Sequence, residues 1–509
     1  MKRWLWLPLL CSACMVGPDY QKPDAPVSVT YKELQGWTVA QPQDAAERGN
    51  WWSVYHDPQL DALEQQVDVS NQTVKQFEAQ YRNAVALVQA AQANLFPVVG
   101  INGSVTRSSG FSGSGVSGSG GVSGTSTFSV TGRNAGAPRT QYSVEGSINW
   151  DLDVWGRVRR QVESQLAGAQ LSAADLANAK LSAQATLATD YFNLRAEDSL
   201  QELLRETVAY YQRALSIIQN QHAAGTVSAA DVVTAQAQLE GARAQLVGVG
   251  VQRALFEHAI AVLTGHPPAD LGISGGVLAS NVPVMPPGLP STLLQRRPDI
   301  AAAERQMQEE NALIGVQIAA FYPDVSLSTL GSFVGSPLSE LFTVANRTWS
   351  LGAAASETLF NGGARTAAVA AARATYDQSV ANYRQVVLTA LQGVEDQLSS
   401  LRILEQQKRA EDIAVAAAQR AVDVTFNQYR AGTVAYTSVI TEQQTLLSDQ
   451  QAQLAVQQSR LVASVALIEA LGGGWDTGQL PQRKDLPNAL DVLKPWPLSG
   501  PPTQPAVNR

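Results

Sequence analysis

Four stretches of the chain alternate apolar and polar residues with a period of two. In the clearest one, YSVEGSINWDLD, every second residue from Tyr142 to Leu152 is apolar except Gly146. This alternation predicts amphipathic strands of about ten residues. We expect strands near 98–107, 142–153, 323–334 and 346–359, the last with Leu359 on its apolar side. Such strands fit either a half-buried soluble sheet or a transmembrane barrel, and their pattern alone does not decide between the two.

Two long stretches of the chain hold no proline, from residue 139 to 266 and from residue 338 to 480. Each predicts a very long helical hairpin whose longer arm reaches about 100 Å. In the second hairpin the apolar residues advance by steps of three or four, a spacing typical of coiled coils. These residues are Tyr376, Val380, Tyr383, Val387, Leu391, Val394, Leu398 and Leu401. The helix pattern alone also fits an isolated antiparallel coiled coil.

The tetrapeptide Ala-Gly-Thr-Val interrupts both helical stretches, at 224–227 and again at 431–434. Glycine takes the left-handed conformation that ends many helices, so the two copies predict tight turns between paired helices. In the first copy, Ser228 and Asp231 have the spacing of a capping box that begins the returning helix. We therefore expect hairpin tips near 222–231 and 429–438, at the end of the molecule opposite the strands.

The repeated tip is part of an internal duplication. VQAAQANLFPVV (88–99) matches VQIAAFYPDV (316–325), and LDVWGRVR (152–159) matches LFNGGART (359–366). The first copy is longer between these matches because it contains a Gly/Ser tract, SSGFSGSGVSGSGGVSG, which is typical of a flexible loop. The division predicted from this pattern is an N-terminal segment (14–57), a first repeat (58–265), a linker (266–295), a second repeat (296–472) and a tail (473–509) that is equatorial or disordered.

The first residues resemble an export signal. Lys2 and Arg3 precede an apolar run, and small residues then stand directly before Cys14. This order predicts a signal peptide over 1–13 and lipidation of Cys14 after its removal. The alternative is a cysteine in a signal peptide that is cleaved nearby without lipid. No later segment offers about 20 uninterrupted apolar residues, which argues against a membrane-spanning helix.

Composition removes several classes of function. The net charge of −8 argues against nucleic acid as a partner. Both cysteines lie in the first fourteen residues and the four histidines are scattered, so we expect no metal site and no cofactor. GSGVSG (113–118) formally fits a nucleotide-binding glycine motif, but no helix follows it. With no nucleophile motif or phosphate-binding lysine either, we expect no catalytic residues and no enzyme.

Several motifs, spread over almost the whole chain, resemble those of the TolC-like outer-membrane factor family, in its lipoprotein branch of RND-type efflux systems. They are CMVGPDYQKP, WWSVYHDPQLDALEQQ, LLQRRPDIAAAE, IGVQIAAFYP, LFNGG, the paired tips and EALGGGW. The resemblance implies an α+β membrane protein with an internal duplication. It forms a homotrimer with a 12-stranded β-barrel, four strands per chain, in outer-membrane lipid, above a long periplasmic α-helical barrel. Four strands alone cannot close a barrel, which agrees with three chains.

The same resemblance implies an outer-membrane exit duct that works with a periplasmic adaptor and an inner-membrane RND-type pump. It makes the two tips adaptor-docking sites: Ala224, Gly225, Thr226, Val227, Ala431, Gly432, Thr433 and Val434. Candidates for the periplasmic gate are Asp231, Tyr429, Ser438, Thr441 and Glu442. Val434 stands where a relative has arginine, and Ser438 and Thr441 where it has aspartates, so the tie between the hairpins is expected to be weaker and the ring less acidic. For Asp231, gating and helix capping both remain open.

Two other functions fit parts of the pattern. One is an outer-membrane channel for type I protein secretion. The other, of a different class, is a periplasmic coiled-coil structural lipoprotein without a barrel. The four amphipathic strands, at matching places in both repeats, argue against it. The sequence names neither the pump nor the exported substrates.

Overall fold

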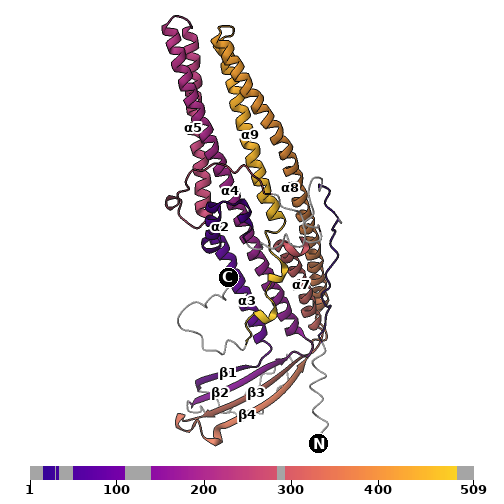
Figure 1. Cartoon of the computed structure of the whole chain (residues 1–509). Coiled ribbons are helices and arrows are strands. Elements are labelled where there is room, and N and C mark those ends of the chain that lie inside the picture. The colour runs from indigo at the N-terminus through magenta and orange to yellow at the C-terminus, as the bar shows by residue number, and fades with distance from the viewer. Residues whose placement is uncertain are drawn as a thin grey trace.

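The computed structural model describes residues 15–28, 30–33, 50–108, 139–283, 290 and 293–489. The predicted signal peptide over 1–13, the predicted lipid site at Cys14, nearly all of the Gly/Ser tract and the tail beyond residue 489 lie outside these residues. Within them, the molecule is a long stack of helices with a small sheet at one end and two hairpin tips at the other (Figure 1).

Two copies of one plan follow each other along the chain, with helices of equal length. A helix of 22 residues comes first, α3 (Gln72–Ala93) or α7 (Pro298–Ala319). After two strands comes a helix of 67 residues, α4 (Arg157–Ala223) or α8 (Ala364–Arg430). It returns as a helix of 35 residues, α5 (Ala229–Leu263) or α9 (Tyr436–Ala470). We call α4 with α5 the first hairpin and α8 with α9 the second.

Shorter elements lie before, between, within and after the two copies. Helix α2 (Pro58–Ser70) begins at a proline behind Asp57, whose side chain accepts hydrogen bonds from the Gln59 and Leu60 amides. Helix α6 (Leu293–Arg296) precedes α7. The remaining short turns are 3₁₀ helices: η3 (Trp51–Tyr55), η4 (Pro268–Asp270), η6 (Leu338–Glu340), η7 (Val344–Asn346), η8 (Thr477–Gln479) and η9 (Arg483–Asp485).

The four strands form one antiparallel sheet in the order β1-β2-β3-β4. They are β1 (Val98–Ser108), β2 (Arg139–Leu152), β3 (Asp324–Gly335) and β4 (Arg347–Ser356). The fourth ends earlier than predicted, because Ser356 pairs with Asp324 at the start of β3 and no partner remains beyond it. Leu359, expected on this strand, is therefore outside it and 94% exposed.

Both outer strands of this sheet are open to pairing. β4 is exposed along its whole length, and large apolar side chains such as Ile101 on β1 and Trp349 on β4 face outward. A sheet cannot leave its edges unpaired in lipid, since each free N–H and C=O group there costs several kcal/mol. The four strands of one chain therefore need further chains to close, and an isolated coiled coil without a sheet is not the fold.

The helical part has two main apolar cores. One joins α2, α4, α5 and α9 around Trp52, Tyr191 and Phe192. The other joins α7, α8 and α9, and it buries the coiled-coil residues of α8 from Tyr383 to Leu401 except Leu391, which is half-buried. Residues of the tail also pack: Leu480 and Leu486 are buried against the helices.

Glu64 of α2 lies inside the first core region with no solvent exposure. Neither of its carboxylate oxygens has a hydrogen-bond partner among the described residues. Burial, together with the nearby carboxylates of Asp68 and Asp61, raises the pKa of Glu64 to about 9. The side chain is therefore neutral at physiological pH, which avoids the high cost of burying an isolated charge.

Helix α5, the returning arm of the first hairpin, is rich in apolar residues. By length and composition alone it is apolar enough to cross a membrane, the one such helix among the described residues. The sequence of α5 has no uninterrupted apolar run of about 20 residues, because scattered polar residues break it. Composition of this kind is weak support for a membrane span, and α5 packs along α4 as the returning arm of the first hairpin.

Candidate functional site

The two tips are built by the same contacts. Gly225 and Gly432 both have φ of +75°, the left-handed conformation predicted for them. The next residue, Thr226 or Thr433, donates both its amide and its hydroxyl to the carbonyl oxygen five residues earlier, at 2.8 to 3.0 Å. These bonds satisfy carbonyl groups that the end of a helix otherwise leaves unpaired. The repeated tetrapeptide is therefore a pair of equivalent helix-ending turns.

The tips offer backbone with free space around it. Ala224, Gly225 and Thr226 are exposed, as are their counterparts Ala431, Gly432 and Thr433. A Cβ atom placed on either glycine would meet no atom of the chain within 4 Å. Val227 and Val434 are half-buried behind them. The four tip residues of each hairpin thus divide into three exposed residues and one half-buried valine.

The returning helices begin differently in the two hairpins. In the first, the Ser228 hydroxyl accepts from the Asp231 amide, and the Asp231 carboxylate accepts from the Ser228 amide at 3.1 Å, which is the predicted capping box. In the second, Ala435 occupies the N-cap without any side-chain bond. Each hydrogen bond described for Asp231 goes to Ser228. Asp231 therefore serves as a cap. Burial raises the pKa of the Tyr429 phenol, and the nearby Asp231 carboxylate raises it further.

Neutral side chains tie the two hairpins together near the tips. The Tyr429 hydroxyl donates to Oε1 of Gln221 at 2.7 Å, which links α8 to α4. Tyr429 also lies against Tyr436, with ring centroids 5.4 Å apart. Beneath them an apolar cluster from α4, α5 and α9 buries Tyr211, Ile218 and Val439. Among the described residues no ion pair joins the first hairpin to the second.

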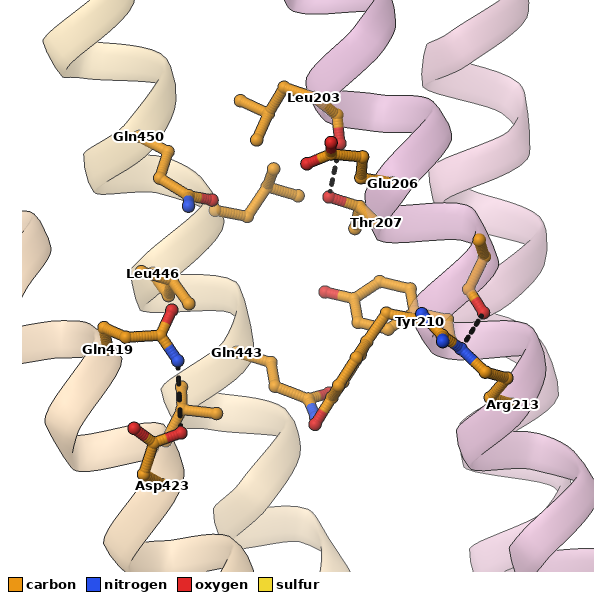
Figure 2. Close-up of a pocket in the computed structure, with 14 residues that line it drawn as sticks. Leu203, Glu206, Thr207, Tyr210, Arg213, Gln419, Asp423, Gln443, Leu446 and Gln450 are labelled. Atoms are coloured by element: carbon orange, nitrogen blue, oxygen red, sulfur yellow. Dashed lines mark hydrogen bonds between the residues drawn. The ribbon is translucent and has the colours of Figure 1, made fainter.

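A second tie lies about two turns further from the tip, at the buried Gln443 of α9. Its side-chain Nε2 donates to the Tyr210 hydroxyl of α4 at 3.1 Å, and its Oε1 accepts from Gln238 of α5 at 3.4 Å. Figure 2 shows Gln443 reaching across from the second hairpin toward Tyr210. A groove of about 500 Å³ opens here, lined from both hairpins. We call the bonds of Tyr429 and Gln443 the inter-hairpin latch.

The remaining gate candidates lie on α9 close to the tip. Ser438 and Thr441 are exposed, and the Thr441 hydroxyl bonds to the carbonyl of Thr437 within its own helix. Glu442 is half-buried. The structure brings none of these three into the latch. Sequence analysis instead missed Gln221, Gln238 and Gln443, because glutamines are abundant on every helix of this chain and nothing in their spacing separates these three.

At the opposite end, the chain that follows Cys14 is clamped beside the sheet. The Val16 amide donates to the Trp155 carbonyl at 3.1 Å. Arg160, which is 1% exposed, donates to the carbonyls of Val16 and Gly17 and to the Asp19 carboxylate. Gly17 has φ of +102°, and a Cβ there would lie 2.5 Å from Cα of Gly315. Only glycine fits this crossing, so the segment from Met15 to Asp19 is firmly held beside the sheet.

The segment continues along the helices as a strap, which we define as residues 15–28 and 30–33. Lys22 pairs with Glu304 at 2.7 Å, and Asn311 donates to the Pro18 carbonyl at 3.0 Å. Further on, the Glu395 carboxylate accepts from the amides of Lys32 and Glu33. The strap therefore connects the first turn of α4 with α7 and α8, across both repeats.

Among the described residues there is no group of three His, Cys, Asp or Glu side chains that could hold a metal ion. What the geometry provides is a long helical body, a sheet with open edges, two exposed tips and a latch between them.

Comparison with known proteins shows the family to which a chain with these features belongs. The family model described as outer membrane efflux protein matches residues 63–266 and 289–473. TtgC of Pseudomonas putida, described as a probable efflux pump outer membrane protein, is 31% identical over 486 residues, covering 93% of this chain and 96% of that protein. The pyoverdine export outer membrane protein OpmQ of Pseudomonas aeruginosa is 29% identical over 471 residues, 92% of this chain and 97% of that protein.

Solved structures show the same architecture. The outer-membrane channel OprN has a TM-score of 0.81 with this chain at 28% identity, covering 91% of this chain and 100% of that one. The predicted fold class is confirmed: a TolC-like channel with four antiparallel strands per chain and a long helical body, consistent with a trimeric barrel. The family and these neighbours are channel proteins, found in the outer membrane. This chain belongs to the outer membrane efflux protein family and forms the outer-membrane exit duct of an efflux pump.

Proposed function

We propose that this exit duct couples, through its two hairpin tips, to a periplasmic adaptor and through that adaptor to an inner-membrane RND-type pump. The observation that carries the proposal is the pair of exposed glycine turns with free space around each glycine. A helical partner approaches backbone most closely where no side chain intervenes. Ala224, Gly225, Thr226 and Val227, with Ala431, Gly432, Thr433 and Val434, form this docking surface.

A photo-reactive side chain at the exposed Ala431 tests this proposal. It should cross-link an adaptor in intact cells, and mass spectrometry of the product identifies which pump system that adaptor serves. An adaptor of an ATP-driven exporter would indicate protein secretion instead of drug efflux. If the same group cross-links equally well from the exposed Val277, far from the tips, docking at the tips is wrong.

The duct is passive in this proposal. Its role is to enclose a path from the adaptor to the cell exterior, so that the energy for export comes from the pump and no catalytic residue or cofactor is needed. The two relatives carry different descriptions, a probable efflux pump channel and a pyoverdine export channel. Only the second description names a cargo, and we propose drugs or other small molecules here without choosing among them.

We further propose that the mature chain begins with an acylated Cys14. The strap supports this, because Met15 and Val16 are held against Trp155 and Gly156 directly below the sheet. Met15 thus lies beside the sheet, the part of the molecule that enters lipid in this proposal, which supports an acyl anchor on the residue before it.

Intact mass spectrometry of the purified protein checks the lipid anchor. We expect a chain that starts at Cys14 and carries the added mass of acyl groups. Cys14→Ala should remove that mass and impair sorting to the outer membrane more than channel function, since the barrel itself holds the protein in lipid. An unmodified Cys14 in the mature chain would contradict the proposal.

We propose that the inter-hairpin latch holds the periplasmic mouth closed. Asp231 contributes through the helix it caps, and Tyr429 through its bond to Gln221. Ser438, Thr441 and Glu442 line α9 next to the latch without joining it. The hydrogen bonds of the latch join only neutral side chains, so their strength should depend little on salt.

The double variant Tyr429→Phe with Gln443→Leu should make the mouth leak. It removes three hydrogen bonds per chain, each with a net contribution of about 1 kcal/mol, so the open fraction should rise at least tenfold. Entry of a large hydrophilic antibiotic into cells measures this, at low and at high salt. Gln444→Leu, on the exposed neighbour of Gln443, is the matched control. A leak no greater than that of the control would rule out the latch.

A further inference from the structure

One face of the β-sheet is apolar from strand to strand. Residues that pair directly across neighbouring strands point to the same face. One such row runs from Ile101 on β1 to Trp349 on β4, and these two side chains are 83% and 75% exposed. Further large, exposed apolar side chains share the face through the two-residue period: Val99, Val105 and Leu351. When three chains close the barrel, this face meets lipid.

Two arginines stand on this apolar face, at the end of the sheet away from the helices. Arg107 is the last residue but one of β1, and Arg347 is the first residue of β4. Each is an even number of residues from Ile101 or Trp349 on its own strand, so each shares their face. Both arginines are exposed. Neither guanidinium forms an ion pair or a hydrogen bond with another described residue.

No strand carboxylate offsets these two charges on the apolar face. The acidic residues of the four strands lie at the alternate positions, which point to the polar face: Glu145, Asp151 and Asp324. The acid nearest to Arg347 in sequence is Glu340, in the loop between β3 and β4, and it forms no ion pair among the described residues. The apolar face therefore ends in uncompensated positive charge.

Aromatic side chains mark both borders of the apolar face. At the end away from the helices, Phe333 pairs with Arg347 across the strands, and its ring lies 5.4 Å from that of Phe342, centroid to centroid. At the end near the helices, Trp150 donates its indole N–H to the Leu95 carbonyl at 3.1 Å. Aromatic girdles are typical of the two lipid–water borders of an outer-membrane barrel. The two arginines therefore lie at the border far from the helices.

We propose that each junction between chains binds a phosphorylated glycolipid of the outer leaflet, between Arg347 of one chain and Arg107 of the partner subunit. Strands β1 and β4 are the two edges of the sheet, so closing the barrel places β4 of one chain beside β1 of the next. The planar guanidinium groups suit phosphate oxygens, which arginine binds with paired hydrogen bonds. Below them, Val105 and Trp349 offer apolar surface to the acyl chains.

The choice of leaflet rests on the proposed function. In that proposal the tips meet an adaptor in the periplasm, so the end of the sheet far from the helices faces the cell exterior. Lipid binding at this end involves no tip residue. A failure of adaptor docking and a failure of lipid binding are therefore separate results.

Lipid titration of the purified, delipidated trimer in detergent tests the site, with bisphosphorylated lipid A as the probe and native mass spectrometry as the readout. The wild type should bind one lipid per junction, and Arg107→Gln with Arg347→Gln should weaken this binding at least tenfold. The control is Arg213→Gln with Arg420→Gln. It removes two exposed charges at equivalent positions of α4 and α8, where each Nε donates only to a carbonyl of its own helix. Trimers on native gels confirm that each variant is folded.

Tight binding by the wild type and the control, but not by the sheet variant, supports the proposal. Equal binding by all three proteins, or by none of them, overturns it. Lipid A without its phosphates should bind the wild type no better than the sheet variant, and tight binding of that lipid would show that the arginines do not recognise phosphate. If phosphatidylglycerol binds the wild type as tightly as lipid A does, the arginines accept any anionic lipid and the glycolipid assignment is wrong.

Discussion

Gly432→Trp is expected to abolish efflux while trimers still form and reach the outer membrane. Nothing in the chain lies within 4 Å of a Cβ at this glycine, so a large side chain meets no obstacle inside its own molecule. The positive φ costs about 1 kcal/mol, which is small for a trimer held by a closed barrel. A tryptophan ring would instead project from the tip and hold a partner helix away. Minimum inhibitory concentrations of exported drugs and cross-linking to the adaptor measure the loss.

Two substitutions separate partner contact from turn geometry. Gly432→Asn keeps a residue that tolerates the left-handed conformation and adds little bulk, so efflux should be nearly normal. Gly363→Trp places the same ring at the other end of α8, where φ is +87° and space is equally free, and it should leave adaptor cross-linking intact. Full drug resistance and normal cross-linking in Gly432→Trp would leave the tip with only a turn-forming role.

Glu64→Gln is expected to stabilise the protein at neutral and alkaline pH and to flatten its pH dependence. The pKa of Glu64 is about 9 in the folded chain, against an ordinary value of 4.5. The folded state therefore binds the Glu64 proton more tightly than the unfolded state does. The contribution of this proton to the free energy of unfolding is complete below pH 4.5 and is lost as pH rises toward 9. The loss is about 1.4 kcal/mol per pH unit across this window. At pH 7 the glutamine variant should thus gain a few kcal/mol per chain.

Thermal unfolding of the trimer in detergent from pH 5 to pH 9 measures this effect. The midpoints of wild type and variant should coincide near pH 5 and diverge as pH increases. Glu202→Gln is the matched control, because that carboxylate is on the helix surface, with 58% of its side chain exposed. Parallel pH profiles for wild type and Glu64→Gln would show that Glu64 is not the neutral, buried acid described above.

Much of the architecture is predictable from local patterns. Period-two alternation located the four strands, and the long proline-free stretches located the two hairpins. Gly225 and Gly432 were recognisable as turns because only glycine takes φ of +75° at little cost. The end of β4 was misplaced, since a strand ends where its partner ends and the partner strand is remote in sequence.

The functional contacts were harder to predict. Asp231 was recognised as a cap, because its partner Ser228 is three residues away. Gln443 was not recognised, because Tyr210 is 233 residues away and only the packing of one hairpin on the other brings them together. The tip residues were found through their repetition, whereas the glutamines of the latch have no equivalent signal.

The sequence by itself determined the duplication, the helical and strand periodicities and the paired tips, because each is visible in the order of residue types along the chain. The tertiary structure decided which polar side chains matter. It buried Glu64 without a partner, joined Gln443 to the first hairpin and placed Arg107 and Arg347 on the same face of one sheet. The physical reason is that burial and pairing depend on neighbours from distant segments, and a residue's type alone does not carry that information.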